Sequence, residues 1–152
     1  MKVSTAKKSA TPKRAIKPIA MAAISFPVKL GQPWPGQGGV FVGTVRGKDG
    51  APDYHLIVGP EMDGEAGWKK SIAWAKKLDV DGHKDFTLPD RREMWFLACQ
   101  GDGLFKPEWY WSSTQHPGAS SAAYVQHFHY GGQDWTRKSS LYRARAVRRI
   151  NI

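Results

Sequence analysis

Residues 82–97, GHKDFTLPDRREMWFL, place a loop directly before the start of a helix, and this junction constrains the middle of the chain more than any other feature. Pro89 keeps the residue before it extended, because a helical conformation there would clash with the proline ring. Asp90 is followed three residues later by Glu93, which is the spacing of a capping box. We therefore predict that a short helix begins after Asp90. Its apolar side chains, Trp95 among them, should face a core.

The remaining segments predict short strands and one more helix. Period-two alternation and clusters of β-branched and aromatic residues indicate extended segments, which we expect over residues 24–30, 40–46, 53–58, 109–114, 122–130 and 140–152. The Asp49-Gly50 step between the second and third of these is typical of a hairpin turn. Apolar residues recur at helical spacing over residues 65–78, where we expect a helix. Two helices among short antiparallel strands predict an α+β domain.

The composition is that of a chain able to build one domain with its own core. It has 152 residues, of which 41% are apolar and seven are tryptophan, and we expect the domain to span residues 23–152. No segment is apolar over the length of a membrane span. The single cysteine, Cys99, excludes an internal disulfide, and its apolar neighbours predict a buried thiol.

The net charge of +10 is concentrated at the two ends of the chain. Residues 1–24 and 135–152 each carry six Lys or Arg and no acidic residue, and the part between them is close to neutral. Residues 1–22 therefore predict a disordered basic tail. The basic runs at residues 2–17 and 137–149 are either solvated or in contact with nucleic acid or an acidic protein.

Three motifs stand in an order that resembles a known family. They are Gly-x-x-Asp-aromatic-x-Leu-Pro-x-Arg-x-Glu at residues 82–93, Tyr-Trp-Ser-Ser-Thr at residues 110–114, and Arg-Ala-Val-Arg-Arg at residues 145–149. Over about residues 64–150 the chain resembles the Lcl C-terminal-like family, which is named for the C-terminus of bacterial collagen-like adhesins and is frequent in phage and bacterial proteins. It departs from that family at residues 86–87, Phe-Thr, where Trp-Arg is usual. The resemblance implies a C-type-lectin-like fold, a small twisted antiparallel sheet flanked by two helices, with long loops that present a ligand surface.

The motif residues are expected to hold this frame together rather than to perform chemistry. The set comprises Asp85, Leu88, Pro89, Glu93, Trp95, Trp111, Arg145 and Arg148. Asp85 should accept backbone N–H groups of its own loop, and Trp95 and Trp111 should be buried between helix and sheet. We expect Arg145 and Arg148 to pair with Asp85 or Glu93.

Catalytic and metal sites are the less favoured interpretations. The hydroxyl cluster at residues 112–114 stands near His116 but lacks a Gly-x-Ser-x-Gly elbow, and one cysteine cannot supply the cysteine pair of the formylglycine-forming enzymes that share the implied fold. His127 and His129, two residues apart on a strand, suit a metal pair, but no third ligand is visible from the spacing. Residues 79–85 lack the spacing of a calcium loop. We therefore expect a non-enzyme that requires no cofactor.

Binding is the remaining function, and two turns are its predicted site. Residues 115–121 and 131–138 should be exposed at one end or at adjacent edges of the strands. Together they offer the ligand-binding candidates His116, Tyr130, Gln133, Asp134, Trp135 and Arg137. Aromatic and adaptable polar groups of this kind suit a protein or glycan surface, although burial of Trp135 in the core is an equal alternative.

Two functional hypotheses follow. The first is a non-catalytic, phage-encoded recognition domain that binds a protein or glycan ligand through these turns. The second is an intracellular accessory or inhibitor protein of a phage or mobile element, whose basic ends contact nucleic acid or an acidic host complex. Because the N-terminal region lacks the form of a secretion signal, we expect a cytoplasmic location, or a place on the virion if the protein is phage-encoded.

Overall fold

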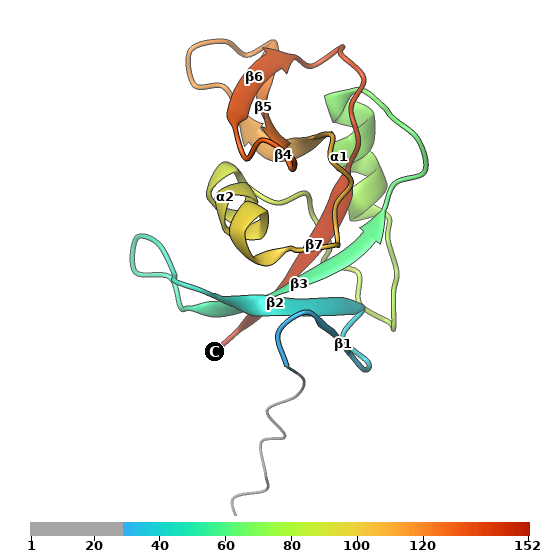
Figure 1. Ribbon diagram of the computed structural model, residues 1–152, viewed down its shortest axis with the longest axis vertical. Helices are drawn as coiled ribbons and strands as arrows, with labels where there is room; N and C mark the ends of the chain where they lie inside the picture. The colour runs from blue at the N-terminus through green and yellow to red at the C-terminus, as the bar shows by residue number, and fades with distance from the viewer. Residues whose placement is uncertain (1–28) are drawn as a thin grey trace, which may run out of the picture.

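The computed structural model describes residues 29–152, and these residues form two helices and seven strands in an α+β arrangement (Figure 1). The predicted tail over residues 1–22 and nearly all of the predicted first strand lie outside the described residues. The elements are, in chain order, β1 (Gln32–Trp34), β2 (Gly39–Val45), β3 (Tyr54–Glu61), α1 (Trp68–Lys76), α2 (Arg91–Gln100), β4 (Trp109–Gln115), β5 (Ala122–His127), β6 (Gln133–Arg137) and β7 (Arg145–Asn151).

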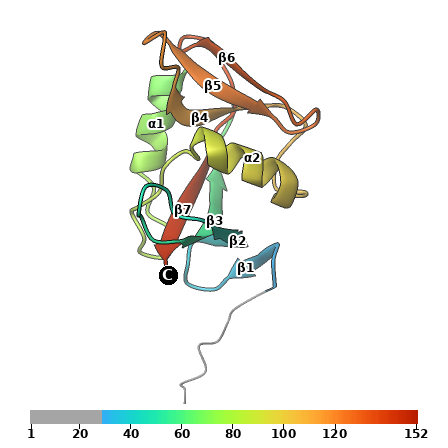
Figure 2. The ribbon, with the colours of Figure 1, turned by 90° about the vertical axis from the view of Figure 1, so that its left-hand side faces the viewer.

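The strands form two antiparallel sheets, whereas the resemblance implied a single one. The first sheet has the order β1-β2-β3-β7, and the second has the order β4-β5-β6. Two views at right angles show α2 lying between the two sheets and α1 standing beside β4 (Figures 1 and 2). The core is therefore divided into one cluster around α2 and the first sheet, and a second around α1 and the second sheet.

The segment before β7 joins the two sheets. Tyr142 and Ala66 exchange both of their backbone hydrogen bonds, at 3.1 and 3.0 Å. The backbone of Arg143 then bonds to Trp109 and Trp111 of β4 before the chain continues into β7, which pairs with β3. The end of the chain is thus a structural tie between both halves of the domain.

The predicted hairpin is confirmed between β2 and β3, which pair antiparallel. Its turn contains Asp49 at a φ of 53° and Gly50 at a φ of 82°. Both angles lie in the left-handed region, which Gly adopts freely and Asp tolerates better than most residues. This conformational demand explains why an Asp-Gly step stands at the turn.

The capping box at the start of α2 is also confirmed. The amide N–H of Glu93 donates to Asp90 Oδ1 at 2.8 Å, and the amide N–H of Asp90 donates to Glu93 Oε2 at 2.9 Å. The helix buries Glu93, Met94 and Leu97. This narrow stripe leaves neighbouring positions outside, so Trp95 is 48% exposed and Cys99 is exposed as well. The predictions that Trp95 and Cys99 are buried are therefore wrong.

Helix α1 is shorter than predicted, because Ala66 is used in the bridge to Tyr142 and Gly67 becomes the N-cap. Its inward face differs in part from the apolar spacing that predicted the helix, because Trp68 and Ile72 are only half-buried. Ser71 and Ala75, one turn apart, are fully buried.

Other motif residues take the structural places expected of them. Trp111 is completely buried, and its indole N–H donates to the carbonyl of Ala66 at 2.8 Å. This bond satisfies the polar atom of a ring that otherwise packs in an apolar core. Leu88 and Pro89 are also buried, in front of α2.

The expected partners of the arginines are correct in one case and wrong in another. Arg148 Nε lies 2.6 Å from Asp85 Oδ1, so this predicted pair is confirmed. Asp85 therefore accepts a hydrogen bond from a side chain, where backbone N–H donors were expected. Arg145 instead donates to the carbonyls of Gly59 and Leu104, and burial lowers its pKa. The side-chain periodicity of a strand does not by itself tell which of several arginines meets a given carboxylate.

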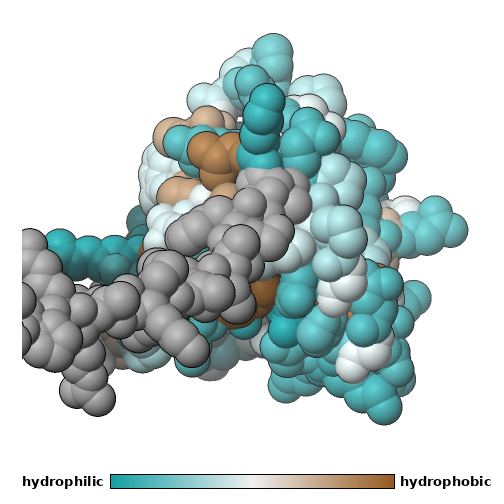
Figure 3. Space-filling view, turned by 90° about the horizontal axis from the view of Figure 1, so that it is seen from below, coloured by the Kyte–Doolittle hydropathy of each residue, from teal (hydrophilic) through white to brown (hydrophobic). Residues whose placement is uncertain are grey.

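The surface seen from below is mainly hydrophilic, with small and separate hydrophobic areas on its described part (Figure 3). Broad apolar areas on a protein surface mark interaction sites, and the visible described residues of this face form none. Within residues 29–152, no helix combines the length and the apolar character needed to cross a membrane.

Replacing the two motif tryptophans separately tests this packing. Trp111→Ala should lower the free energy of unfolding by about 3–5 kcal/mol, because a large ring leaves a closed core. Trp95→Ala should change it by less than about 1 kcal/mol, since the ring is half exposed. Urea unfolding followed by circular dichroism measures both values, and equal losses would contradict the packing described.

Candidate functional site

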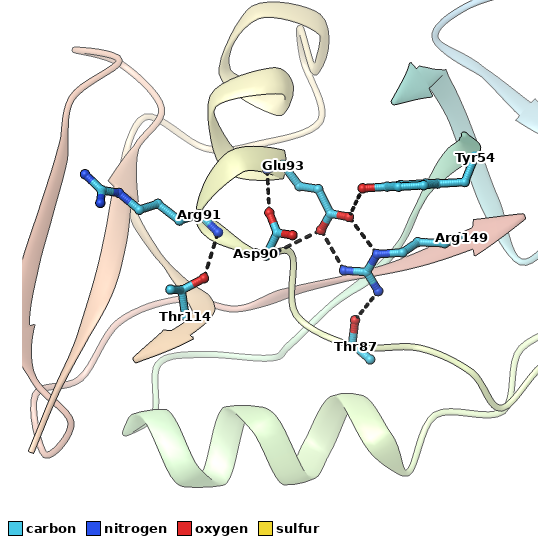
Figure 4. A network of polar contacts seen from close by, with 7 residues as sticks. All are labelled: Tyr54, Thr87, Asp90, Arg91, Glu93, Thr114 and Arg149. Carbon is cyan, nitrogen blue, oxygen red and sulfur yellow. Dashed lines mark hydrogen bonds and ion pairs between the residues drawn. The ribbon is translucent and has the colours of Figure 1, made fainter. Parts of the chain in front are cut away.

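A buried carboxylate lies at the centre of the polar contacts at the start of α2 (Figure 4). Glu93 receives two hydrogen bonds from Arg149, Nε to Oε1 and Nη2 to Oε2, both at 2.6 Å. Tyr54 donates to Oε1 at 2.5 Å, and the Asp90 amide donates to Oε2. Four donors for two oxygens fill the usual acceptor sites of a carboxylate, so Glu93 is committed to holding the fold.

The pKa values agree with a structural ion pair. Burial alone would raise the pKa of Glu93, but the hydrogen bonds and charge of Arg149, aided by Tyr54, outweigh it and lower the pKa. Burial and the bond to Glu93 raise the pKa of Tyr54 to about 12. Glu93 therefore stays ionised and Tyr54 stays protonated near neutral pH. A general acid or base works best with a pKa near the operating pH, which neither group has.

A groove of about 750 Å³ lies over this network. Tyr54, Glu93 and Arg149 contribute to its lining, together with the half-buried side chains of Trp68 and Ile72. Glu93 and Arg149 are bonded to each other, but the groove is also lined by three cations that take part in none of the ion pairs within residues 29–152, namely Lys48, Lys76 and Arg92.

A second surface is organised by the register of β5 and β6. Trp135 stands opposite Tyr124, and Gln133 stands opposite Gln126. Opposite residues of an antiparallel pair share a face, as do residues two apart along a strand. Trp135, Gln133 and Tyr124 therefore lie on one face of the hairpin.

Three rings gather on this face. The ring of His116 lies 4.8 Å from that of Trp135 and 5.5 Å from that of Tyr124, measured between centroids. Tyr124 is nearly buried, whereas Trp135 is 53% exposed. The cluster is thus anchored on its inner side by Tyr124 and open to solvent at Trp135.

The first residue of α2 attaches to the same face. The guanidinium carbon of Arg91 lies 4.0 Å from the centroid of the Tyr124 ring. Arg91 Nε donates to Gln133 Oε1 at 2.8 Å, and Gln133 Nε2 donates back to the carbonyl of Arg91 at 2.7 Å. The amide of Arg91 also donates to Thr114 Oγ1, as Figure 4 shows. We call the set Arg91, His116, Tyr124, Gln133 and Trp135 the recognition face.

A smaller groove of about 390 Å³ adjoins the recognition face through Arg91. Trp95, one helical turn after Arg91, lines it together with Lys48 and Arg92. The exposed Trp135 on β6 and the exposed Trp95 on α2 therefore belong to neighbouring surfaces, and Arg91 contributes to both.

The structure brings together half of the predicted ligand-binding residues. His116, Gln133 and Trp135 meet on the recognition face, and Arg137 is exposed at the end of the same strand. Asp134 lies on the opposite face of β6, and its carboxylate accepts the amide N–H of Trp135 at 2.8 Å. The expected second turn is therefore largely a strand, with its residues divided between two faces.

Tyr130 lies outside the recognition face, in the turn that joins β5 to β6. It is 80% exposed, and its ring contacts those of His127 and His129 at 4.6 and 4.9 Å. The two histidines do not share one strand, because β5 ends at His127. His127 Nδ1 accepts the amides of His129 and Tyr130, and within residues 29–152 no group of three or more metal-ligating side chains is assembled.

Sequence reasoning missed Arg91 and Tyr124 as members of this surface. For Tyr124 the signal was misleading, since a two-residue turn at Gly131-Gly132 would place Phe128 opposite Trp135, where the structure has Tyr124. For Arg91 there was none, because its partner Gln133 is 42 positions away. Contacts of that separation depend on how α2 docks against the second sheet.

Comparison with known proteins adds no relative from which a function could be transferred. No family model matches the chain, and no curated protein matches it. The resemblance to the Lcl C-terminal-like family therefore stays a prediction that rests on the order of three motifs.

The lowered pKa of Glu93 predicts a loss of stability in acid. Because the unfolded chain takes up this proton more readily than the folded one, the contribution of Glu93 is complete above the ordinary carboxylate pKa. It is lost as the pH falls through the lowered pKa of the folded state. The free energy of unfolding of Glu93→Gln should therefore fall less steeply toward low pH than that of the wild type.

The exposed Glu65 provides the matched control. Chemical denaturation at a series of pH values should give parallel curves for Glu65→Gln and the wild type, and a flatter curve for Glu93→Gln. Three parallel curves would contradict the electrostatic role of the buried carboxylate.

Proposed function

We propose that this protein is a non-catalytic recognition domain that binds a protein or glycan ligand through the recognition face. The observation that supports this most directly is the open cluster of Trp135, His116 and Tyr124 held beside Arg91. Trp, Tyr and Arg are the residue types that contribute most to binding hot spots.

The rigidity of the face supports the proposal. Gln133 and Arg91 bond to each other twice, and Arg91 also lies over the ring of Tyr124. Side chains that are already fixed before binding lose less conformational entropy when a ligand arrives. A ligand that covered Trp135 would gain buried apolar area without first having to order its surroundings.

We further propose a C-type-lectin-like fold and a phage origin for the domain. The α+β architecture and the structural use of the motif residues support the fold, since Pro89, Glu93 and Trp111 are buried and Arg148 is paired. The phage origin rests on the resemblance to a family that is frequent in phage proteins. In such a frame the motif maintains the scaffold, and the exposed hairpin is left to meet the ligand.

The second hypothesis, binding of nucleic acid or an acidic complex by the basic ends, finds less support at the C-terminal end. There Arg143, Arg148 and Arg149 pair with Glu108, Asp85 and Glu93. Among the cations of residues 137–149, Arg137, Lys138 and Arg145 pair with no carboxylate of the described residues, and Arg145 donates to two backbone carbonyls instead. That hypothesis therefore depends mainly on residues 2–17, which lie outside the described part.

Binding by Trp135→Ala and Tyr130→Ala tests the proposal. Both remove an exposed aromatic ring of the same hairpin, but Tyr130 lies outside the recognition face. A glycan array and a quantitative pull-down from host lysate identify ligands of the wild type. Trp135→Ala should weaken their binding by at least about 30-fold, the size of a hot spot, and Tyr130→Ala should retain it. Equal retention by both variants would refute the recognition face.

The dependence of binding on salt separates the two hypotheses. Binding through the recognition face should change little between low and moderate salt. If residues 1–22 carry the contact, affinity should fall steeply with salt, and this dependence should vanish when they are deleted.

A further inference from the structure

A third hollow, of about 620 Å³, lies between the start of α1, the loop before β5 and the end of β6. Its lining includes four cationic side chains, namely those of Lys69, Lys70, Arg137 and Lys138. No carboxylate contributes to that lining. A concave site with four positive charges and no negative one favours an anion.

Three of these cations are available to a ligand. None of the ion pairs formed within residues 29–152 involves Lys69, Lys70 or Arg137, and all three side chains are exposed. Lys138 is held in place, since its ammonium donates to Gln115 Oε1 at 2.6 Å and lies 4.2 Å from the ring centroid of Trp68. It supplies fixed positive charge at the edge of the hollow.

Hydroxyl groups complete the lining. Ser120, Ser121 and Ser139 come from two different segments and face the same hollow as the cations. Hydroxyl donors combined with Lys and Arg are suited to the several acceptor oxygens of a phosphate or sulfate group. A single carboxylate ligand would use only part of this donor set.

Backbone hydrogen bonds fix the three segments that form the hollow. The amide of Trp68 donates to the carbonyl of Lys138 at 2.9 Å, and the amide of Lys138 donates to the carbonyl of Ser121 at 2.8 Å. Gly67 permits this approach, because a Cβ there would lie 3.1 Å from the Lys138 oxygen. The donors are thus carried on a connected frame.

We propose that this hollow binds a phosphate or sulfate group carried by a small sugar or nucleoside. Its volume falls within the range of roughly 300–1,000 Å³ that is usual for small-molecule sites, so there is room for the group that carries the anion. The site does not include Trp135 and is independent of the recognition face. Its ligand would be recognised by charge and hydrogen bonding. This site could therefore bind its ligand even if the recognition face bound none.

Isothermal titration with four probes tests the site and separates the sources of the anion. The probes are inorganic phosphate, a sugar monophosphate, a nucleoside monophosphate and a sulfated disaccharide, each beside its uncharged parent where one exists. The wild type should bind at least one of the charged probes and none of the uncharged parents. The probe that binds most tightly indicates which anion and which carrier the site prefers.

A pair of double variants on α1 shows whether binding is local. Lys69→Gln/Lys70→Gln removes two cations of the hollow, and Lys76→Gln/Lys77→Gln removes two exposed cations from the other end of the helix, with the same change in net charge. The first should weaken binding at least ten-fold and the second should leave it within two-fold. Circular dichroism checks that both remain folded.

Three results would overturn the proposal. They are no binding of any charged probe at millimolar concentration, equal weakening by both double variants, and binding of the uncharged parents as tight as that of the charged probes. Trp135→Ala should bind the anion like the wild type, so failure of this site and failure of the recognition face are distinguishable.

Discussion

Glu93 is a charged group without solvent contact, and the pairing of its carboxylate with Arg149 is the constraint on which the arrangement of the elements depends. Taking a carboxylate out of water costs several kcal/mol, and only close and complete hydrogen bonding offsets it. The bonds come from three elements: β7 through Arg149, β3 through Tyr54, and the start of α2 through Asp90. Any displacement of α2 from the first sheet would leave the charge unpaired. The helix is therefore fixed in position by a polar contact as well as by the apolar stripe around it.

The position of α2 in turn determines the recognition face. The residue that follows the cap, Arg91, extends toward the second sheet, where it contacts Gln133 and Tyr124. Glu93 thus ties the first turn of α2 to the first sheet through Arg149, and Arg91 ties the same turn to the second sheet through Gln133. The closing segment reinforces this link, because it bonds to β4 before it enters β7. In this account the recognition face is rigid because the helix between the sheets is held at both sides.

Sequence patterns predicted the features that depend on neighbours along the chain. The capping box, the Asp49-Gly50 hairpin and the strand at Trp109–Gln115 follow from spacing and turn chemistry. They did not predict the division into two sheets, the exposure of Trp95, or the choice of Arg149 as the partner of Glu93. Those features depend on how preformed elements dock, and a helix with apolar residues around much of its circumference does not specify which stripe faces the core. The recognition face was predicted in part, since His116, Gln133 and Trp135 were expected but Arg91 was not.

The coupling between Glu93 and Arg149 is the most direct test of this account. A double-mutant cycle with Glu93→Gln, Arg149→Met and the combined variant, followed by urea unfolding at neutral pH, isolates the free energy of their interaction. The account predicts that the double variant loses less stability than the sum of the two single variants, by about 1–3 kcal/mol, because each single change leaves a buried charge or donor without its partner. Losses that add to within about 0.5 kcal/mol would contradict it, since two residues that do not interact behave in that way.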